Sequence, residues 1–126
     1  MDNLEAVVIE ADPALALLIS TVLREDGFTI QLATTGPAGV EAVQKSTPSM
    51  VTTDLFLPGF DGHEVIRRIR LFSDVPLLIL CGSNDLVDLQ SGLGAGADSY
   101  LAKPFSANVL QAYIRALQRR PAWLSR

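Results

Sequence analysis

Four side chains with useful chemistry follow apolar segments of the chain: Glu10, Asp54, Cys81 and Lys103. Such segments predict buried strands, and the carboxyl ends of parallel strands in an open α/β sheet lie side by side. We therefore expect these four residues at one edge of a sheet. Two neighbouring carboxylates suggest a hard divalent cation such as Mg²⁺. Asp54 can act as a nucleophile that forms an aspartyl phosphate, and Lys103 offers it a charge partner.

The patterns of strand and helix alternate five times along the chain. This predicts an α/β fold, with a doubly wound, five-stranded parallel sheet covered by helices on both faces. The pair Asp12-Pro13 is typical of a helix start, with Asp as N-cap and Pro in the first turn. The expected strands are residues 4–10, 28–33, 50–54, 75–81 and 99–102. The expected helices begin at about residues 12, 35, 62, 84 and 106, and the last ends at about residue 120.

The composition is that of one globular domain. Of 126 residues, 48% are apolar and 19% charged, which is enough for a sizeable core. The net charge of −4 argues against nucleic-acid binding by this domain. No apolar stretch reaches the ~18 residues of a membrane span, and the start lacks the basic head of a signal peptide. The single cysteine excludes an internal disulfide. These features predict a cytoplasmic protein that does not associate with membranes.

Taken in order and spacing, four segments resemble a receiver domain of bacterial response regulators over essentially the full chain: Val7–Glu10, Asp54–Gly62, Gly94–Tyr100 and Lys103–Phe105. The resemblance implies a CheY-like, flavodoxin-like sheet with strand order 2-1-3-4-5. It implies that Asp54 is the phosphoacceptor and that Lys103 contacts the phosphoryl group. It also implies that Tyr100 is the aromatic switch residue.

The same resemblance implies partners. A sensor histidine kinase would phosphorylate the domain, and an effector would respond, either the protein's own C-terminal domain or another protein. The segment Gly96-Ala97-Asp98 and the closing Arg119-Arg120 are most similar to receivers that precede a winged-helix DNA-binding domain, so the expected role is in transcription. We expect a receiver domain at residues 1–120 and the start of a linker or tail at residues 121–126.

Two positions near Asp54 depart from the family pattern. Receivers carry an acidic pair after the first strand, and its second member binds Mg²⁺ directly, but here the pair reads Glu10-Ala11. The position after the fourth strand, normally Thr or Ser, is Cys81, whose thiol is a weaker donor than a hydroxyl. The remaining metal ligands would be Glu10, Asp54 and a backbone carbonyl near Phe56. We therefore expect Mg²⁺ binding to be weak or absent and phosphorylation to be impaired.

A third departure concerns assembly. The resemblance implies a homodimer joined by ion pairs on the face that residues at about 84–93, 99–102 and 106–120 share. Asp98 and Arg115 remain on this face, but expected charged positions are replaced by Ser99, Val109 and Tyr113. Any dimer should therefore rest on apolar packing. The alternative is that these side chains pack within the domain, which would then be a monomer.

Some residues allow a second interpretation. Asp12 could replace the lost metal ligand, although a structural N-cap is favoured. Glu10 is either an outer-sphere metal ligand or, without metal, a partner for Lys103. Cys81 is more typical of a small buried hydrophobe than of a redox sensor. His63 and the arginines of residues 67–70 are interpreted as solvent-facing residues of a helix.

Three functional classes follow from these observations. The first is a phosphorylatable receiver that switches an effector, and the second is a degenerate receiver that acts as a phosphorylation-independent interaction module. The third, an enzyme such as a phosphotransferase or hydrolase, lacks a second nucleophile and a general-base histidine near Asp54. We expect an atypical receiver that is not an enzyme, with Ala11 as the residue that separates the first two classes.

Overall fold

Apolar side chains alternate along each central strand and form two separate cores. In β1 (Leu4–Ile9), Val7 and Ile9 belong to the core on one face of the sheet, whereas Ala6 and Val8 belong to the other. All four are at most 1% exposed. A parallel sheet covered on both faces requires near-continuous apolar strands of this kind.

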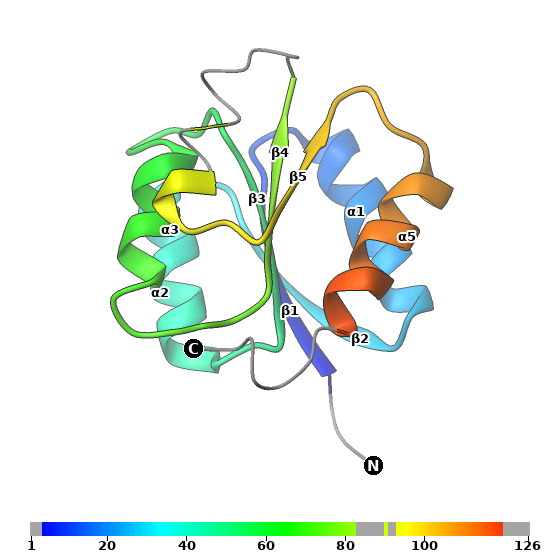
Figure 1. Ribbon diagram of the computed structural model, residues 1–126, viewed down its shortest axis with the longest axis horizontal. Helices are drawn as coiled ribbons and strands as arrows, with labels where there is room; N and C mark the ends of the chain where they lie inside the picture. Colours follow the sequence, from blue (N-terminus) through cyan, green and yellow to red (C-terminus); the bar gives the residue numbers. More distant parts are fainter. Residues whose placement is uncertain (1–3, 83–89, 91–92, 120–126) are drawn as a thin grey trace.

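The computed structural model of the protein describes residues 4–82, 90 and 93–119. Its five strands are all parallel and lie in the order β2-β1-β3-β4-β5 (Figure 1). The predicted fold class and strand order are thereby confirmed. The other strands are β2 (Phe28–Ala33), β3 (Met50–Asp54), β4 (Leu77–Cys81) and β5 (Ser99–Ala102).

The helices lie in two layers, one on each face of the sheet (Figure 1). Helices α2 and α3 contact each other over the first core, and α1 and α5 contact each other over the second. The bounds are α1 (Pro13–Glu25), α2 (Gly36–Ser46), α3 (Gly62–Ile69) and α5 (Ala107–Gln118), and residues 93–95 are also helical.

A side-chain oxygen caps the start of each of these four helices. The caps are Asp12, Thr35, Asp61 and Ser106, and each accepts a hydrogen bond from a backbone N–H in the first turn. Such a cap stabilises a helix by about 1 kcal/mol because it satisfies a donor that the helix itself leaves free. The predicted role of Asp12 as an N-cap is confirmed.

The predicted boundaries differ from the structure in the fourth strand, which begins at Leu77 and not at Val75. The carbonyl of Val75 is bound by Arg70, and Pro76 has no N–H to add to the sheet. Most of the predicted helix at about residues 84–93, and the linker at residues 121–126, lie outside the described residues. Among the described helices, none is long and apolar enough to cross a membrane.

Candidate functional site

Asp54 and Lys103 meet at the carboxyl edge of the sheet, as their positions in the sequence predict. Asp54 ends β3 and Lys103 follows β5, and the Lys103 Nζ lies 2.7 Å from the Asp54 Oδ2. The other carboxylate oxygen of Asp54, Oδ1, accepts the backbone N–H of Leu55 at 2.7 Å. Asp54 is only 6% exposed, so these two donors compensate for the loss of water around a buried carboxylate.

Glu10 reaches the same site from the end of β1 and is 2% exposed. Its Oε2 accepts the N–H of Asp12 at 3.1 Å, while Oε1 is buried with no hydrogen-bond partner among the described residues. Burial raises the pKa of Glu10 to about 7; the Asp12 N–H lowers it, contact with Asp54 raises it, and Lys103 lowers it. Lys103 pairs with Asp54, and the pairing of Lys103 with Glu10 that was also expected is not found among the described residues.

Cys81 ends β4, the strand next to β3, and Tyr100 lies on β5, which pairs with β4. Cys81 is fully buried, as expected for a small apolar group, and its carbonyl accepts the N–H of Lys103 at 2.7 Å. Tyr100 is half-buried and packs against the core that contains Cys81. This places the predicted switch residue one strand away from the thiol that replaces its usual coupling partner.

The residues around Asp54 fit a Mg²⁺ ion poorly. Ala11 presents a methyl group where a carboxylate ligand would stand, and Asp12 uses its Oδ1 to cap α1. One oxygen of Asp54 is already bound to the ammonium of Lys103. Within the described residues, no group of three His, Cys, Asp or Glu side chains could hold a metal ion. A hard cation prefers several oxygen ligands, and this site supplies two carboxylates and the backbone.

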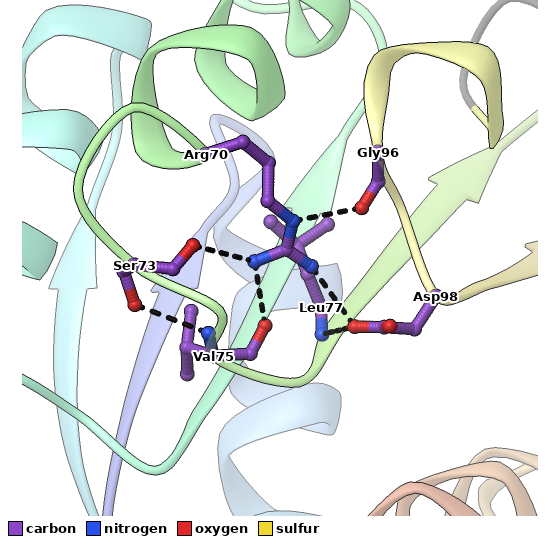
Figure 2. Close-up of polar contacts among 6 residues, drawn as sticks. All are labelled: Arg70, Ser73, Val75, Leu77, Gly96 and Asp98. Atoms are coloured by element: carbon purple, nitrogen blue, oxygen red, sulfur yellow. Dashed lines mark hydrogen bonds and ion pairs between the residues drawn. The ribbon is translucent and has the colours of Figure 1, made fainter. Parts of the chain in front are cut away.

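Arg70 is a structural residue that the sequence interpretation missed. It was expected to face solvent, but its side chain is only 19% exposed and binds the turns that lead into β4 and β5 (Figure 2). Its guanidinium donates to the carbonyls of Gly96 and Val75, each at 2.8 Å, and to Asp98 at 2.9 Å. The same Asp98 oxygen accepts the N–H of Leu77 at 2.8 Å. Because Arg70 ends α3, its long side chain reaches the segment that leads into β5 and fixes the start of that strand.

His63 also differs from expectation. Its side chain is half-buried, its Nδ1 lies 3.9 Å from the Asp61 Oδ2, and its Nε2 is buried with no partner among the described residues. The reason is that the first turn of α3 folds back onto the end of β3, where the Gly62 N–H donates to the Leu55 carbonyl at 2.7 Å. A solvent-facing position for His63 is therefore wrong.

Both charges that remain on the β5–α5 face are bound within the chain. Asp98 is held by Arg70, and Arg115 contacts Asp26 at 3.0 Å beyond the end of α1. By contrast, Val109 and Tyr113 on α5 are 42% and 36% exposed, so part of each apolar side chain remains uncovered by the domain. The charges are thus engaged inside the molecule while the apolar side chains remain on its surface.

A flavodoxin-like sheet that presents a buried aspartate paired with a lysine at its carboxyl edge defines the receiver class of signalling domains. The comparison with known families agrees. The chain belongs to the response regulator receiver domain family, which it matches over residues 6–115. The family resemblance seen in the sequence is thereby confirmed. Receiver domains generally use Mg²⁺ for phosphorylation.

Curated relatives are transcriptional regulators. The chain is 38% identical to the transcriptional regulatory protein AfsQ1 of Streptomyces coelicolor and 40% identical to the DNA-binding response regulator MtrA of Mycobacterium tuberculosis, each over 114 residues. These matches cover 90% of this chain but 51% and 50% of the relatives, so the chain spans about half their length.

Solved structures show the same fold. A putative response regulator from Chloroflexus aurantiacus superposes with a TM-score of 0.88 at 29% identity, covering 94% of this chain and all of the other. The BeF3-activated N-terminal receiver domain of RstA from Klebsiella pneumoniae gives a TM-score of 0.85 at 27% identity, covering 92% and 99%.

Proposed function

We propose that this chain is an atypical receiver of a two-component system, with Asp54 as the phosphoacceptor position. It would receive its phosphoryl group from a sensor histidine kinase and regulate an effector that controls transcription. The observation that carries this proposal is the ion pair of Lys103 with Asp54, 2.7 Å long, at the edge of the sheet. The DNA-binding and transcriptional relatives, which are about twice as long as this chain, support an attached effector.

The reaction would be a direct transfer to Asp54. A carboxylate oxygen of Asp54 attacks the phosphorus of a phosphohistidine, the new P–O bond forms as the P–N bond breaks, and the released imidazole nitrogen takes up a proton. Lys103 then exchanges the Asp54 Oδ2 for a phosphoryl oxygen and balances its charge. Cys81 offers this oxygen only a thiol, which is a weak donor.

We infer that the transfer is slow. The methyl group of Ala11 provides no oxygen for a cation beside Asp54, and both Asp54 oxygens already have protein donors. The same observations favour a second candidate function, in which the domain keeps the receiver fold but acts by protein contacts without phosphorylation. In that case the ion pair of Asp54 with Lys103 would be structural only.

One experiment separates these functions. The purified chain is incubated with acetyl phosphate over a range of Mg²⁺ concentrations, and its phosphorylation is followed by intact mass. Slow modification that disappears in Asp54→Asn supports the atypical receiver. Modification that needs Ala11→Asp supports the interaction module. Modification that persists in Asp54→Asn, or none in either background, rejects Asp54 as the acceptor.

We further propose that the domain self-associates through the surface formed by β5 and α5. The exposed side chains of Val109 and Tyr113 supply apolar area, while Asp98 and Arg115 are engaged with partners in their own chain. Such an interface would depend on packing and not on ion pairs between subunits. It would therefore form without phosphorylation. The cytoplasmic location expected from the sequence stays a prediction.

A further inference from the structure

The loop of residues 55–61, which follows Asp54, rests against the first turn of α2. The N–H of Gly36 donates to the carbonyl of Pro58 at 3.0 Å. Phe60 is half-buried and packs against the core beneath α2 and α3, which lie side by side on this face of the sheet (Figure 1). The start of α2 is distant from Asp54 in the sequence, yet it contacts the loop that follows Asp54.

Two glycines permit this contact. A methyl group added at Gly36 would collide with the carbonyl oxygen of Phe60 and come within 2.9 Å of its Cδ1 and 3.1 Å of its Cε1. Gly59 has a φ of +90°, and a methyl group there would collide with the ring of Pro37. No larger side chain fits at either place without moving the loop.

The Phe60 ring also contacts a side chain of α3. The guanidinium carbon of Arg68 lies 4.3 Å from the ring centroid, a cation–π distance. Arg68 is itself held by Glu64, whose Oε2 accepts its Nε–H at 2.7 Å. The ring therefore contacts both the start of α2 and the exposed Arg68 of α3.

We propose that the contact of Gly36 with Phe60 is a latch through which α2 positions the loop of residues 55–61 and regulates the reactivity of Asp54. The connection to the carboxylate is short. Leu55 donates its N–H to the Asp54 Oδ1 at 2.7 Å, and its carbonyl accepts the N–H of Gly62 at 2.7 Å, so both ends of the loop meet beside Asp54. A misplacement of ~1 Å in a reacting group can cost on the order of 100-fold in rate. The part of this proposal that concerns reactivity rests on the proposed function.

The test compares Gly36→Ala with a matched variant of the same helix, Gly39→Ala. A methyl group at Gly39 would meet the side chain of Ile9 first, at 2.5 Å from its Cδ1 and 2.8 Å from its Cγ1 and Cγ2, so its closest contacts are in the core and not in the loop. Amide hydrogen exchange of residues 55–61 is measured in both, along with thermal stability. We expect Gly36→Ala to speed exchange in the loop by about tenfold or more, and Gly39→Ala to lower stability with no selective change there.

The second readout is phosphorylation by acetyl phosphate, in the natural chain and in an Ala11→Asp background. We expect Gly36→Ala to slow it by about tenfold or more, while Gly39→Ala leaves the rate within about twofold. Three outcomes would each overturn the latch. The two variants could have equal effects, or Gly36→Ala could leave hydrogen exchange in the loop unchanged. The third outcome is faster exchange in the loop with an unchanged rate of phosphorylation.

Failure of the proposed function gives a different result. If neither background accepts a phosphoryl group, Asp54 is not an acceptor, and the exchange data alone decide whether the latch exists. If Gly36→Ala does not fold, Phe60→Leu takes its place, because it keeps an apolar side chain but removes the ring that lies on Gly36. The same selective increase in loop exchange is then expected, and its absence rejects the proposal.

Discussion

The ammonium group of Lys103 lies 2.7 Å from the Oδ2 of Asp54, so the charge that would meet an incoming phosphoryl group is already bound to the acceptor. The pair connects the end of β5 to the end of β3, across the intervening β4. Glu10, the third ionisable group of the site, accepts the N–H of Asp12, and the neighbouring Asp54 adds to the rise of its pKa that burial causes. The carboxylates of the site are thus bound by Lys103 and by the backbone N–H groups of Leu55 and Asp12.

Removing the lysine should cost more stability than removing the charge of the aspartate. Lys103→Ala leaves two buried carboxylates close together, and we expect a loss of about 2 kcal/mol, below the ~3–5 kcal/mol of a fully buried pair because Lys103 is partly exposed. Asp54→Asn relieves the repulsion with Glu10 and should change stability by less than about 1 kcal/mol. Urea unfolding of the three proteins measures both. Equal losses, or a larger loss for Asp54→Asn, would contradict the arrangement.

The raised pKa of Glu10 should appear in the pH dependence of stability. Its pKa is about 7 in the folded chain against an ordinary value of 4.5, so the folded state binds the extra proton between these values. The contribution of Glu10 to stability is therefore greatest below about pH 4.5, falls as pH rises to about 7, and stays low above it. Glu10→Gln should remove this fall and stabilise the protein at about pH 8 more than at about pH 5.

Urea unfolding at the two pH values checks the sign. The control is Glu41→Gln, because Glu41 is an exposed carboxylate on α2 whose Oε2 lies 3.4 Å from the Lys45 Nζ, far from the acidic cluster in the sequence. It should leave the pH dependence close to that of the natural chain. If Glu10→Gln gains more stability at the lower pH, Glu10 is ionised throughout and its burial does not control its protonation.

Mg²⁺ should bind weakly. Losing a group that only orients a metal ligand typically costs ~10- to 100-fold in metal affinity, so the lack of a direct carboxylate ligand at Ala11 should cost at least as much. Calorimetry should find that the dissociation constant for Mg²⁺ is millimolar or weaker. Ala11→Asp should tighten Mg²⁺ binding by about tenfold or more. The control variant Ala112→Asp adds the same charge on the exposed face of α5 and should not tighten Mg²⁺ binding. Sub-millimolar affinity in the natural chain would refute the expectation.

Tyr100 should not respond to a phosphoryl group on Asp54. A ligand shifts a conformational equilibrium only by its difference in affinity for the two states, and the Cys81 thiol offers little difference. We expect one dominant Tyr100 rotamer with and without beryllium fluoride, read from the ring signals in NMR spectra. Cys81→Thr supplies the hydroxyl and should restore a response. A shift of the Tyr100 signals on binding in the natural chain would show that the switch is intact.

Self-association should be insensitive to salt. Burying the exposed parts of Val109 and Tyr113 gains ~25 cal/mol per Å² of apolar surface, and screening weakens ion pairs but not this contact. Sedimentation at low and high salt should give the same dimer, and Tyr113→Arg should dissociate it. Leu17→Arg, at an exposed apolar position on α1, is the matched control and should remain dimeric. A monomer at micromolar concentrations, or a dimer that salt dissociates, would rule out the apolar interface.

Much of the site was predictable because it depends on local signals. Apolar runs predict strands, the Asp12-Pro13 pair predicts a helix start, and parallel strands bring their carboxyl ends together. The pairing of Asp54 with Lys103 follows from these rules, whereas the strand order was implied by the resemblance to receiver domains, and both are found. The replacement by Ala11 is visible from the chain alone, because it is a matter of which residue stands at a position.

Only the tertiary structure decided which long side chains meet across the fold. Arg70 looked solvent-facing because periodicity describes one helix at a time, yet its guanidinium binds Gly96, 26 residues away. Arg115 binds Asp26, 89 residues away, and so is engaged within its own chain. The close contact of Phe60 with Gly36 likewise requires α2 and the loop after β3 to lie side by side. Sequence patterns set the elements and their order, whereas such contacts depend on the distances between packed elements, which only the assembled core defines.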